Sequence, residues 1–381
     1  MSRIAAVGAE VVRISDRTCW TFLRLRDDDG VEGFGEASLF GREELVMAAL
    51  RSRAATLIGA PVARDRSRVP PTAPLHEAAA DSAIGQALLD IAARRRGAPA
   101  AEALGGARRE KIPLYANINR RTRDRTPEGF AKSARDAKAA GHVAFKIAPF
   151  DAVTPDLCRA GEAAMGIAHG FACAAAVGDA VGPGHEVMID CHWRFDETRA
   201  ADVIAEAAKL GIVWVECPLP ESPDAIPAIK RLRGLANIRG IRLAGCEELV
   251  GLDSFMPFIA AGAYDVLMPD VKYCGGPTEM LLLAQTMTKH GAAFSPHNPS
   301  GPICHAASLH VSAATENLDR LETQFDEGPL FSELARETIP PSVAGCSALP
   351  AGPGLGLTLD PAVAAKARVT RWSSDGGEAL A

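Results

Sequence analysis

The apolar and polar positions at the start of the chain follow the pattern of strands and then of helices. Residues 4–14 and 20–26 alternate in the manner of strands, an Asp-rich turn lies at 27–30, and VEGFGEAS continues the meander. From Glu43 to about Gly106 the sequence becomes rich in Ala and Leu with helical spacing. Strands followed by helices predict an α+β unit, which we place at residues 1–110.

From residue 111 onward the pattern changes to eight short apolar runs that alternate with amphipathic helical stretches. This alternation is typical of a parallel α/β barrel, which we place at residues 111–340. Residues 341–381 return to loop character, and we expect them to pack back on the first unit and to end in a disordered tail. The eight runs are KIPLYANI (111–118), HVAFKIA (142–148), EVMID (186–190), GIVWVE (211–216), IRLAG (241–245), YDVLMPD (264–270), AAFSPH (292–297) and RLETQF (320–325).

Composition and charge narrow the class of function. With 381 residues, 48% of them hydrophobic and 23% charged, the chain can bury a large core and has the make-up of an ordinary soluble protein. The formal net charge of −6 argues against a nucleic-acid partner or an anionic membrane. We therefore expect a small-molecule substrate, and an anionic one would depend on local positive charge such as a metal or a lysine.

The cysteines and the N-terminus indicate a reducing compartment. The nine cysteines are scattered without a CxxC pair, which favours free thiols in a cytoplasmic protein over a disulfide frame or a zinc site. Glu10 interrupts the apolar stretch near the N-terminus, so no signal peptide is expected. We also find no apolar run long enough to predict a membrane span.

Three carboxylates close the third, fourth and fifth apolar runs: Asp190, Glu216 and Glu247. In a parallel barrel the strand C-termini converge on one face, where barrel enzymes place their chemistry. Three carboxylates gathered there repel each other unless a cation lies among them, and an all-oxygen ligand set suits Mg²⁺. The neighbouring Glu248 competes with Glu247 for the third position.

Two histidines follow the same strand ends. Asp270 and His297 close the sixth and seventh runs, so the carboxylate could hold the imidazole in one orientation, as a proton acceptor requires. His192 lies two residues after Asp190, on the same face of the strand, where it could give a proton to a departing hydroxide. The alternative for His192 is a structural role, packed on Trp193 or capping the next helix.

The second and eighth runs add a lysine and a glutamate. Lys146 could bind a substrate carboxylate, or it could be a surface lysine. Glu322 could be a protonated acid bonded to the other carboxylate oxygen, or it could pair with Arg320.

With these residues the chain resembles the enolase superfamily, specifically its mandelate racemase subgroup. The resemblance rests on the three carboxylates, on Asp270 five residues before Gly275-Gly276, on SPHNPSGP with His297, and on LE with Glu322. It implies an α+β capping domain on a modified TIM barrel of the (β/α)7β type. It also implies Mg²⁺ as cofactor and favours Glu247 over Glu248 as the third ligand.

Two departures from the racemase pattern narrow the expected reaction. The family's KxK pair on the second strand is reduced to Lys146-Ile147-Ala148, so the usual second base is missing. Asp190-Cys191-His192 instead resembles the DxH arrangement of galactonate-type dehydratases. Lys272 lies two positions beyond the place where other subgroups carry a catalytic lysine, and we assign it no catalytic role.

The resemblance therefore implies a Mg²⁺-dependent dehydratase of an acid sugar, an aldonate or aldarate. His297, oriented by Asp270, removes the proton α to the substrate carboxylate, near Lys146 and Glu322. His192 protonates the leaving 3-hydroxyl, and the product is a 2-keto-3-deoxy acid.

Other functions and the substrate's identity stay open. A racemase, epimerase or cycloisomerase could use the same Asp–His pair, and a barrel that only binds acid sugars or works without metal is a further alternative. We expect substrate contacts from Tyr115, Asn117 and Trp193 and from loops near Ser15–Trp20 and Leu39–Arg42. The family resemblance also implies a homo-oligomer, a dimer or an octamer.

Overall fold

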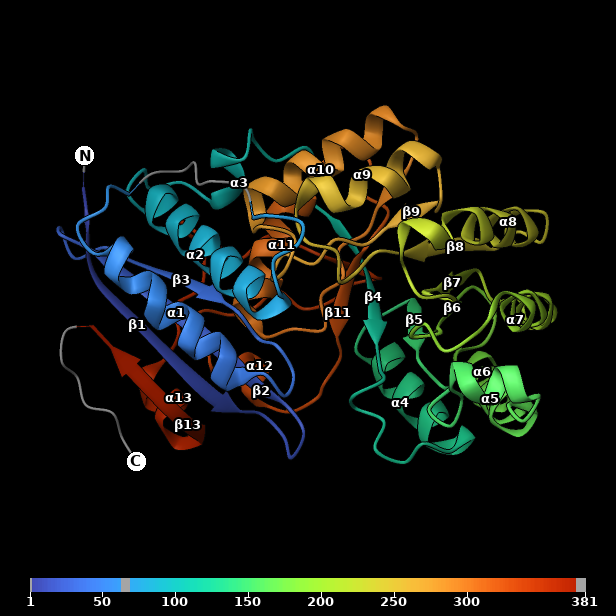
Figure 1. Cartoon of the computed structure of the whole chain (residues 1–381). Helices are drawn as coiled ribbons and strands as arrows, with labels where there is room; N and C mark the ends of the chain where they lie inside the picture. Colours follow the sequence, from blue (N-terminus) through green and yellow to red (C-terminus); the bar gives the residue numbers. More distant parts are fainter. Residues whose placement is uncertain (1, 63–68, 375–381) are drawn as a thin grey trace.

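An antiparallel sheet with helices on one side forms the first part of the fold. The computed structural model describes residues 2–62 and 69–374. The sheet has the strand order β13-β1-β2-β3, and the blue and red strands at the left of Figure 1 show it. Its strands are β1 (Ile4–Arg13), β2 (Cys19–Asp27), β3 (Glu32–Glu36) and β13 (Arg368–Ser373), and its helices are α1 (Glu43–Leu57), α2 (Leu75–Arg94) and α3 (Ala100–Ala103).

One face of the capping sheet and its helices share an apolar core. Val7, Leu23 and Leu25 are buried together with Leu50 of α1 and Ile84 of α2. The inner face of the sheet therefore packs on two helices, as the strand-then-helix pattern predicts.

The second sheet is a curled parallel one. Within the described residues its strands follow the order β10-β9-β8-β7-β6-β5-β4-β11. Backbone bonds from Phe294 N to Asn317 O (3.0 Å) and from Asp319 N to Phe294 O (2.8 Å) join β10 to the residues directly before β11, the strand at the other end of this order. The strands are β4 (Ile112–Asn117), β5 (Ala144–Ile147), β6 (Glu186–Asp190), β7 (Trp214–Glu216), β8 (Arg242–Gly245), β9 (Val266–Leu267), β10 (Ala293–Phe294) and β11 (Leu321–Gln324).

Helices connect consecutive barrel strands and cover the sheet from outside, at the right of Figure 1. Each predicted apolar run contains one of the eight strands, so the expected (β/α)7β barrel with an α+β capping domain is confirmed. The connecting helices are α4 (Pro127–Ala139), α5 (Pro155–Ala160), α6 (Ala164–Val181), α7 (Glu197–Lys209), η1 (Pro223–Ala225), α8 (Ile226–Asn237), α9 (Gly251–Ala261), α10 (Pro277–Lys289) and α11 (Pro302–Ala314).

The C-terminal part returns to the capping sheet. Residues 341 onward were expected to be loop, but they contain β12 (Cys346–Ser347) and α13 (Pro361–Ala367) before β13; α12 (Leu330–Glu333) precedes them. β13 pairs antiparallel with β1, so the last strand lies beside the first. The disordered tail predicted at the C-terminus lies outside the described residues from 375 on, and the domain limits at 110 and 340 stay a prediction.

One helix of the described residues meets the length and composition criteria for a membrane span. By length and composition α6 is apolar enough to cross a membrane, with a mean hydropathy of 1.4 over 18 residues, of which 33% are buried. The continuous-run criterion missed it because His169 and Asp179 interrupt the apolar residues. A single such helix is weak evidence for a span, and α6 is part of the β5–β6 connection and packs on α4.

Candidate active site

The three predicted metal ligands meet at the C-terminal ends of neighbouring strands. Asp190 and Glu216 are the last residues of β6 and β7 and lie opposite each other in the parallel register. Glu247 follows two residues after β8. The relative exposures are 3% for Asp190, 0% for Glu216 and 4% for Glu247, so all three carboxylates are withdrawn from water.

The chain turns sharply where it leaves these strands. Four non-glycine residues there have positive φ: His192 (45°), Trp193 (57°), Cys217 (45°) and Cys246 (75°). Such conformations cost energy and persist where surrounding contacts hold them. One of those contacts is the bond from the Cys246 N–H to Glu221 Oε1 at 2.6 Å.

Asp190, His192 and Glu247 form a compact group that could hold a cation. One ligand atom from each lies within 4.8 Å of the others. Nε2 of His192 is 2.7 Å from Oδ2 of Asp190, whose Oδ1 accepts the His192 backbone N–H at 2.9 Å. Oε2 of Glu247 is buried without a hydrogen-bond partner. Glu248, the competitor for this position, is exposed.

Glu216 faces Lys146 instead. Its Oε1 accepts a hydrogen bond from Lys146 Nζ, and its Oε2 accepts the Trp214 indole N–H at 2.9 Å. Because a carboxylate offers about four lone-pair sites, these bonds leave Glu216 able to coordinate a cation as well.

The electrostatics of the carboxylates favour a positive charge among them. Burial, together with the charges of Asp190 and Glu216, raises the pKa of Glu247 well above its ordinary value. Burial also raises the pKa of Glu216 to about 7, although Lys146 opposes this rise. Burial alone would raise the pKa of Asp190, but the charge of His192 and its hydrogen bond lower it to about 2. An unpartnered oxygen among mutually repelling carboxylates fits a hard divalent cation.

Lys146 bridges Glu216 and Glu322. The Lys146 ammonium, 1% exposed, lies 3.0 Å from Oε1 of Glu322. Glu322 also accepts hydrogen bonds from Asn117 Nδ2 at 2.6 Å and from the Asn298 N–H at 2.9 Å. Burial would raise the pKa of Glu322, but the charge of Lys146 brings it below the ordinary value.

This environment favours an ionised Glu322 over the protonated acid that the sequence suggested. The other sequence-based alternative, a pair with Arg320, is not formed among the described residues. Arg320 is bonded to Glu186 and lies 3.5 Å from Asp319.

The predicted Asp–His pair is formed. A parallel bridge places Asp270 beside His297, and Nδ1 of His297 is 2.8 Å from Oδ2 of Asp270. Nε2 of His297 lies 3.6 Å from Oε2 of Glu247 and 3.9 Å from Oε2 of Glu322. The nitrogen available for proton transfer thus faces the carboxylate group.

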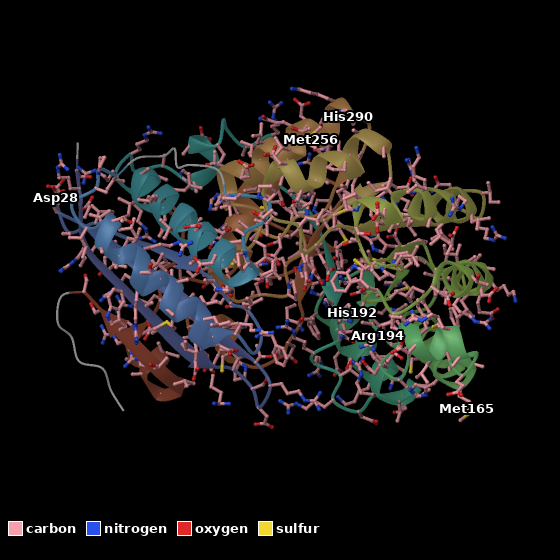
Figure 2. All side chains as sticks on the ribbon, viewed as in Figure 1. Asp28, Met165, His192, Arg194, Met256 and His290 are labelled. Carbon is pink, nitrogen blue, oxygen red and sulfur yellow. The ribbon has the colours of Figure 1, made fainter. Side chains whose placement is uncertain are left out.

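A cavity of about 1030 Å³ lies over these residues, between the barrel and the capping domain. Asp190, His192, Glu247 and His297 line it from the barrel. Figure 2 shows His192 near the centre of the view, between the capping sheet and the outer barrel helices. The capping domain contributes residues 15–20, which match the first loop region expected to contact substrate, and residues 38–40, which overlap the second at Leu39 and Phe40.

The residues expected to bind substrate divide into two groups. Asn117 and Trp193 line the cavity. Tyr115 is fully buried inside the barrel against Trp214, with its ring centroid 5.3 Å from Lys146 Nζ. The structure therefore places Tyr115 behind Lys146 and not on the described cavity wall.

The sequence did not indicate three residues that hydrogen-bond to the site residues or to the backbone beside them. Asn298 supports Glu322, Glu221 supports the backbone before Glu247, and Lys272 bonds to Asp270. Asn298 adjoins His297, and its place in the SPHNPSGP segment was the available signal. Nothing in the spacing of Glu221 or Lys272 indicated their contacts, which depend on the path of the loops.

Comparison with known proteins agrees with this geometry. Residues 11–105 match the family model of the mandelate racemase / muconate lactonizing enzyme N-terminal domain, and residues 129–363 match the enolase C-terminal domain-like family. The chain belongs to the enolase superfamily. The resemblance noted from the sequence is thereby confirmed.

Several proteins that are named as enzymes are similar in sequence to most of this chain. D-gluconate dehydratase of Thermoproteus tenax is 30% identical, over 91% of this chain and 69% of that protein. D-galactonate dehydratase of Xanthomonas euvesicatoria pv. vesicatoria is 29% identical, over 90% of this chain and 89% of that protein. D-galactarolactone cycloisomerase of Agrobacterium fabrum is also 29% identical, over 91% of this chain and 90% of that protein. A solved mandelate racemase/muconate lactonizing enzyme from Jannaschia sp. CCS1 shares the fold, with a TM-score of 0.83, 24% identity and 99% of both chains covered.

Proposed function

We propose that this protein is a Mg²⁺-dependent dehydratase of an acid sugar, an aldonate or aldarate. In this reaction the proton α to the carboxylate is removed and the 3-hydroxyl is eliminated. The enol product becomes a 2-keto-3-deoxy acid. Two similar proteins named dehydratases of D-gluconate and D-galactonate support the reaction class.

One observation carries the proposal. Two histidines, each beside its own aspartate, line the same cavity together with Glu247. His297 lies 3.6 Å from Glu247, and His192 lies 2.7 Å from Asp190, which belongs to the same compact group as Glu247. Dehydration needs one base and one acid near a single substrate, and this pair supplies both.

Asp190, Glu216 and Glu247 are the residues that would hold the cation. Bound there, Mg²⁺ would supply positive charge to the substrate carboxylate while the α-proton leaves. The buried, unpartnered oxygen of Glu247 and the all-oxygen ligand set support this assignment.

The chain's own residues provide the proton transfers. Asp270 accepts from Nδ1 of His297 and so leaves Nε2 as the base for the α-proton. His192 gives its proton to the leaving hydroxide; its side chain is 38% exposed, so it can reach a ligand in the cavity. Lys146 and Glu322 form the polar support beneath the substrate carboxylate.

The alternative is a racemase, epimerase or cycloisomerase with the same base. The cycloisomerase of similar sequence supports this alternative. A racemase, however, needs acid–base groups on both faces of the α-carbon, and Ala148 occupies the usual position of the second one. We therefore prefer dehydration.

Three lesser points belong to the same proposal. The nine cysteines are all free, which suits a reducing compartment and supports the cytoplasm. The substrate is a small carboxylate, and the assembly is a homo-oligomer, as in the sequence-based expectation.

A product assay tests the proposal. The full-length protein with Mg²⁺ is incubated with a panel of aldonates and aldarates that includes D-gluconate and D-galactonate, and 2-keto acid is measured. We expect keto acid from at least one substrate and its loss in EDTA, with recovery when Mg²⁺ is restored. Turnover that EDTA does not change would show that the reaction needs no metal. An epimer without keto acid would favour the racemase or epimerase.

A further inference from the structure

Lys272 is buried against the Asp270–His297 pair. It lies between β9 and α10, is 2% exposed, and belongs to the cavity lining. Its backbone N–H donates to Oδ1 of Asp270 at 2.8 Å, and its Nζ donates to Oδ2 of the same carboxylate at 2.6 Å. Nζ also donates to Oγ of Ser300. One lysine thus contacts both oxygens of the aspartate that orients the predicted base.

Lysine and histidine share one carboxylate oxygen. Oδ2 of Asp270 lies 2.6 Å from Lys272 Nζ and 2.8 Å from His297 Nδ1. A carboxylate with donors on both oxygens cannot turn freely about its side-chain bond. The plane in which it accepts from Nδ1, and hence the orientation of the imidazole, is therefore fixed by Lys272.

The charge of Lys272 and its hydrogen bonds both stabilise the ionised form of Asp270. Burial would raise the pKa of Asp270, but the charge of Lys272 and the hydrogen bond of His297 lower it. An ionised Asp270 can only accept a hydrogen bond, so Nδ1 of His297 carries the proton and Nε2 stays free. Nε2 is the atom that faces Glu247 at 3.6 Å.

We propose that Lys272 is a positioning residue for the reaction: it holds the Asp270 carboxylate so that Nε2 of His297 points at the α-carbon of the substrate. This rests on the proposed function, in which His297 is the base. Ser300 is the second anchor of the lysine, and it lies in the segment that links His297 to α11.

Two other roles for Lys272 predict different results. A lysine that binds substrate directly would mainly change KM when removed. A lysine that only completes the core would change stability and leave both the kinetics of the folded enzyme and the tautomer of His297 unaltered.

The kinetic test is a double-mutant cycle in the full-length protein with Mg²⁺. The variants are Lys272→Met, Asp270→Asn and both together, with Lys289→Met, an exposed lysine of α10, as the matched control. We expect Lys272→Met to lower kcat by about 10²-fold with little change in KM, because a small misplacement of a catalytic group costs about that much. In the Asp270→Asn background, Lys272→Met should cause no further loss.

The outcomes of the cycle are distinct. Additive losses, a change in KM alone, or wild-type kinetics in Lys272→Met would overturn the proposal. Lys272→Arg, which keeps the charge and a donor, should recover part of kcat. Mg²⁺ affinity should be unchanged in every Lys272 variant, because the lysine does not contact the proposed ligands.

A second measurement does not depend on finding the substrate. In protein labelled with ¹⁵N-histidine, the His297 signals are assigned by their absence in His297→Asn. Wild type and Lys289→Met should show the Nδ1–H tautomer, whereas Lys272→Met should show a mixture of tautomers or faster exchange of the Nδ1 proton. An unaltered spectrum would overturn the positioning role, even if the dehydratase proposal holds. A changed spectrum without turnover of any acid sugar would instead count against the dehydratase proposal.

Ser300→Ala keeps the test decisive if Lys272→Met does not fold. It removes the hydroxyl that anchors the ammonium and leaves the charge in place. We expect a smaller loss of kcat and a smaller spectral change in the same direction. Wild-type rate and spectrum in this variant would contradict the proposal.

Discussion

The environment of a single residue, Glu247, supports a cation at this site. It is 4% exposed, and one of its oxygens has no hydrogen-bond partner. Burial and two neighbouring carboxylates raise its pKa, so its negative charge is unfavourable without a counter-charge. A protein keeps such a residue at a cost in stability, and a divalent cation would remove that cost.

Glu247→Gln should therefore have opposite effects with and without Mg²⁺. In EDTA the melting temperature should rise by about 2–4 °C, the shift that roughly 1 kcal/mol produces in a large domain, because a repelled charge is removed. Mg²⁺ affinity should fall by at least about tenfold. Calorimetric titration and thermal unfolding measure both effects.

Glu248→Gln is the matched control, because Glu248 adjoins Glu247 in the sequence and is exposed. It should bind Mg²⁺ like the wild type. If Glu248→Gln weakens binding and Glu247→Gln does not, the assignment of the third ligand is wrong.

At the residue scale, the sequence predicted which side chains gather but not how they pair. Asp190, Glu216 and Glu247 could be located because each ends a strand of one barrel. The contact between Lys146 and Glu216 could not be predicted, because it depends on the rotamer of a long side chain that reaches from β5 past β6 to β7. The same holds for Lys272, which folds back on Asp270 only because the loop after β9 turns there.

At the scale of elements, β3 of the capping sheet caps a barrel helix. Glu36, the last residue of β3, is fully buried and accepts the N–H groups of Gly301 (2.8 Å) and Cys304 (3.0 Å) at the N-terminus of α11. A Cβ on Gly301 would come within 2.9 Å of Glu36 and 2.8 Å of Trp20. The capping domain thus fixes the start of α11, directly after the segment that carries His297.

Glu36→Gln should weaken this junction. The amide replaces one acceptor oxygen with a donor, which faces an N–H group that then has no partner. We expect a loss of about 1–3 kcal/mol in the free energy of unfolding, as for a lost helix cap or an unsatisfied buried group. Denaturant unfolding measures it, and kcat should fall along with it because the His297 segment loosens.

Glu32→Gln on the same strand is the control, since Glu32 is partly exposed and pairs with Arg24 at the surface. Its effect should stay within about 0.5 kcal/mol. Equal losses in the two variants would show that Glu36 has no special role at the junction.

The elements that periodicity revealed are those that pack on their sequence neighbours. The barrel strands and the capping strands β1 to β3 alternate with helices or turns, so their patterns repeat along the chain. β12 and β13 could not be found in this way, because they pair with β4 and β1, which lie far away in the sequence.

At the scale of the whole molecule, stability should depend on pH through the buried carboxylates. Burial raises the pKa of Glu216 to about 7 and that of Glu247 well above its ordinary value. A carboxyl group whose pKa is raised in the folded state does not lower the free energy of unfolding below about pH 4.5, because it is then protonated in both the folded and the unfolded chain. As pH rises toward 7, the unfolded chain ionises first and the folded state loses relative stability. For Glu216 the loss is about 3 kcal/mol at most.

Mg²⁺ should therefore stabilise the protein more at high pH than at low pH. In EDTA these two groups make the folded state less stable between about pH 4.5 and 7, and bound Mg²⁺ removes their contribution. Buried histidines such as His305 and His310, whose pKa burial lowers to about 4, act in the opposite direction with and without metal. Their effect on stability therefore cancels when the values with and without Mg²⁺ are subtracted.

Unfolding measured with and without Mg²⁺ from pH 5 to pH 8 checks this expectation. A Mg²⁺ effect that grows with pH supports the carboxylate site. A constant effect would show that the cation binds elsewhere.

In the proposed reaction His297 is the base and His192 is the acid, and proton NMR in D₂O separates these two roles. Wild type, His297→Asn and His192→Asn are compared with Mg²⁺ and the acid sugar that gives keto acid. The wild type should lose the α-proton signal and develop a 3-deoxy methylene pattern. His192→Asn should exchange the α-proton without forming the methylene, and His297→Asn should do neither while it still binds Mg²⁺, with losses of about 10²–10⁴-fold. Exchange retained in His297→Asn, or exchange lost in His192→Asn, would show that these roles are wrongly assigned.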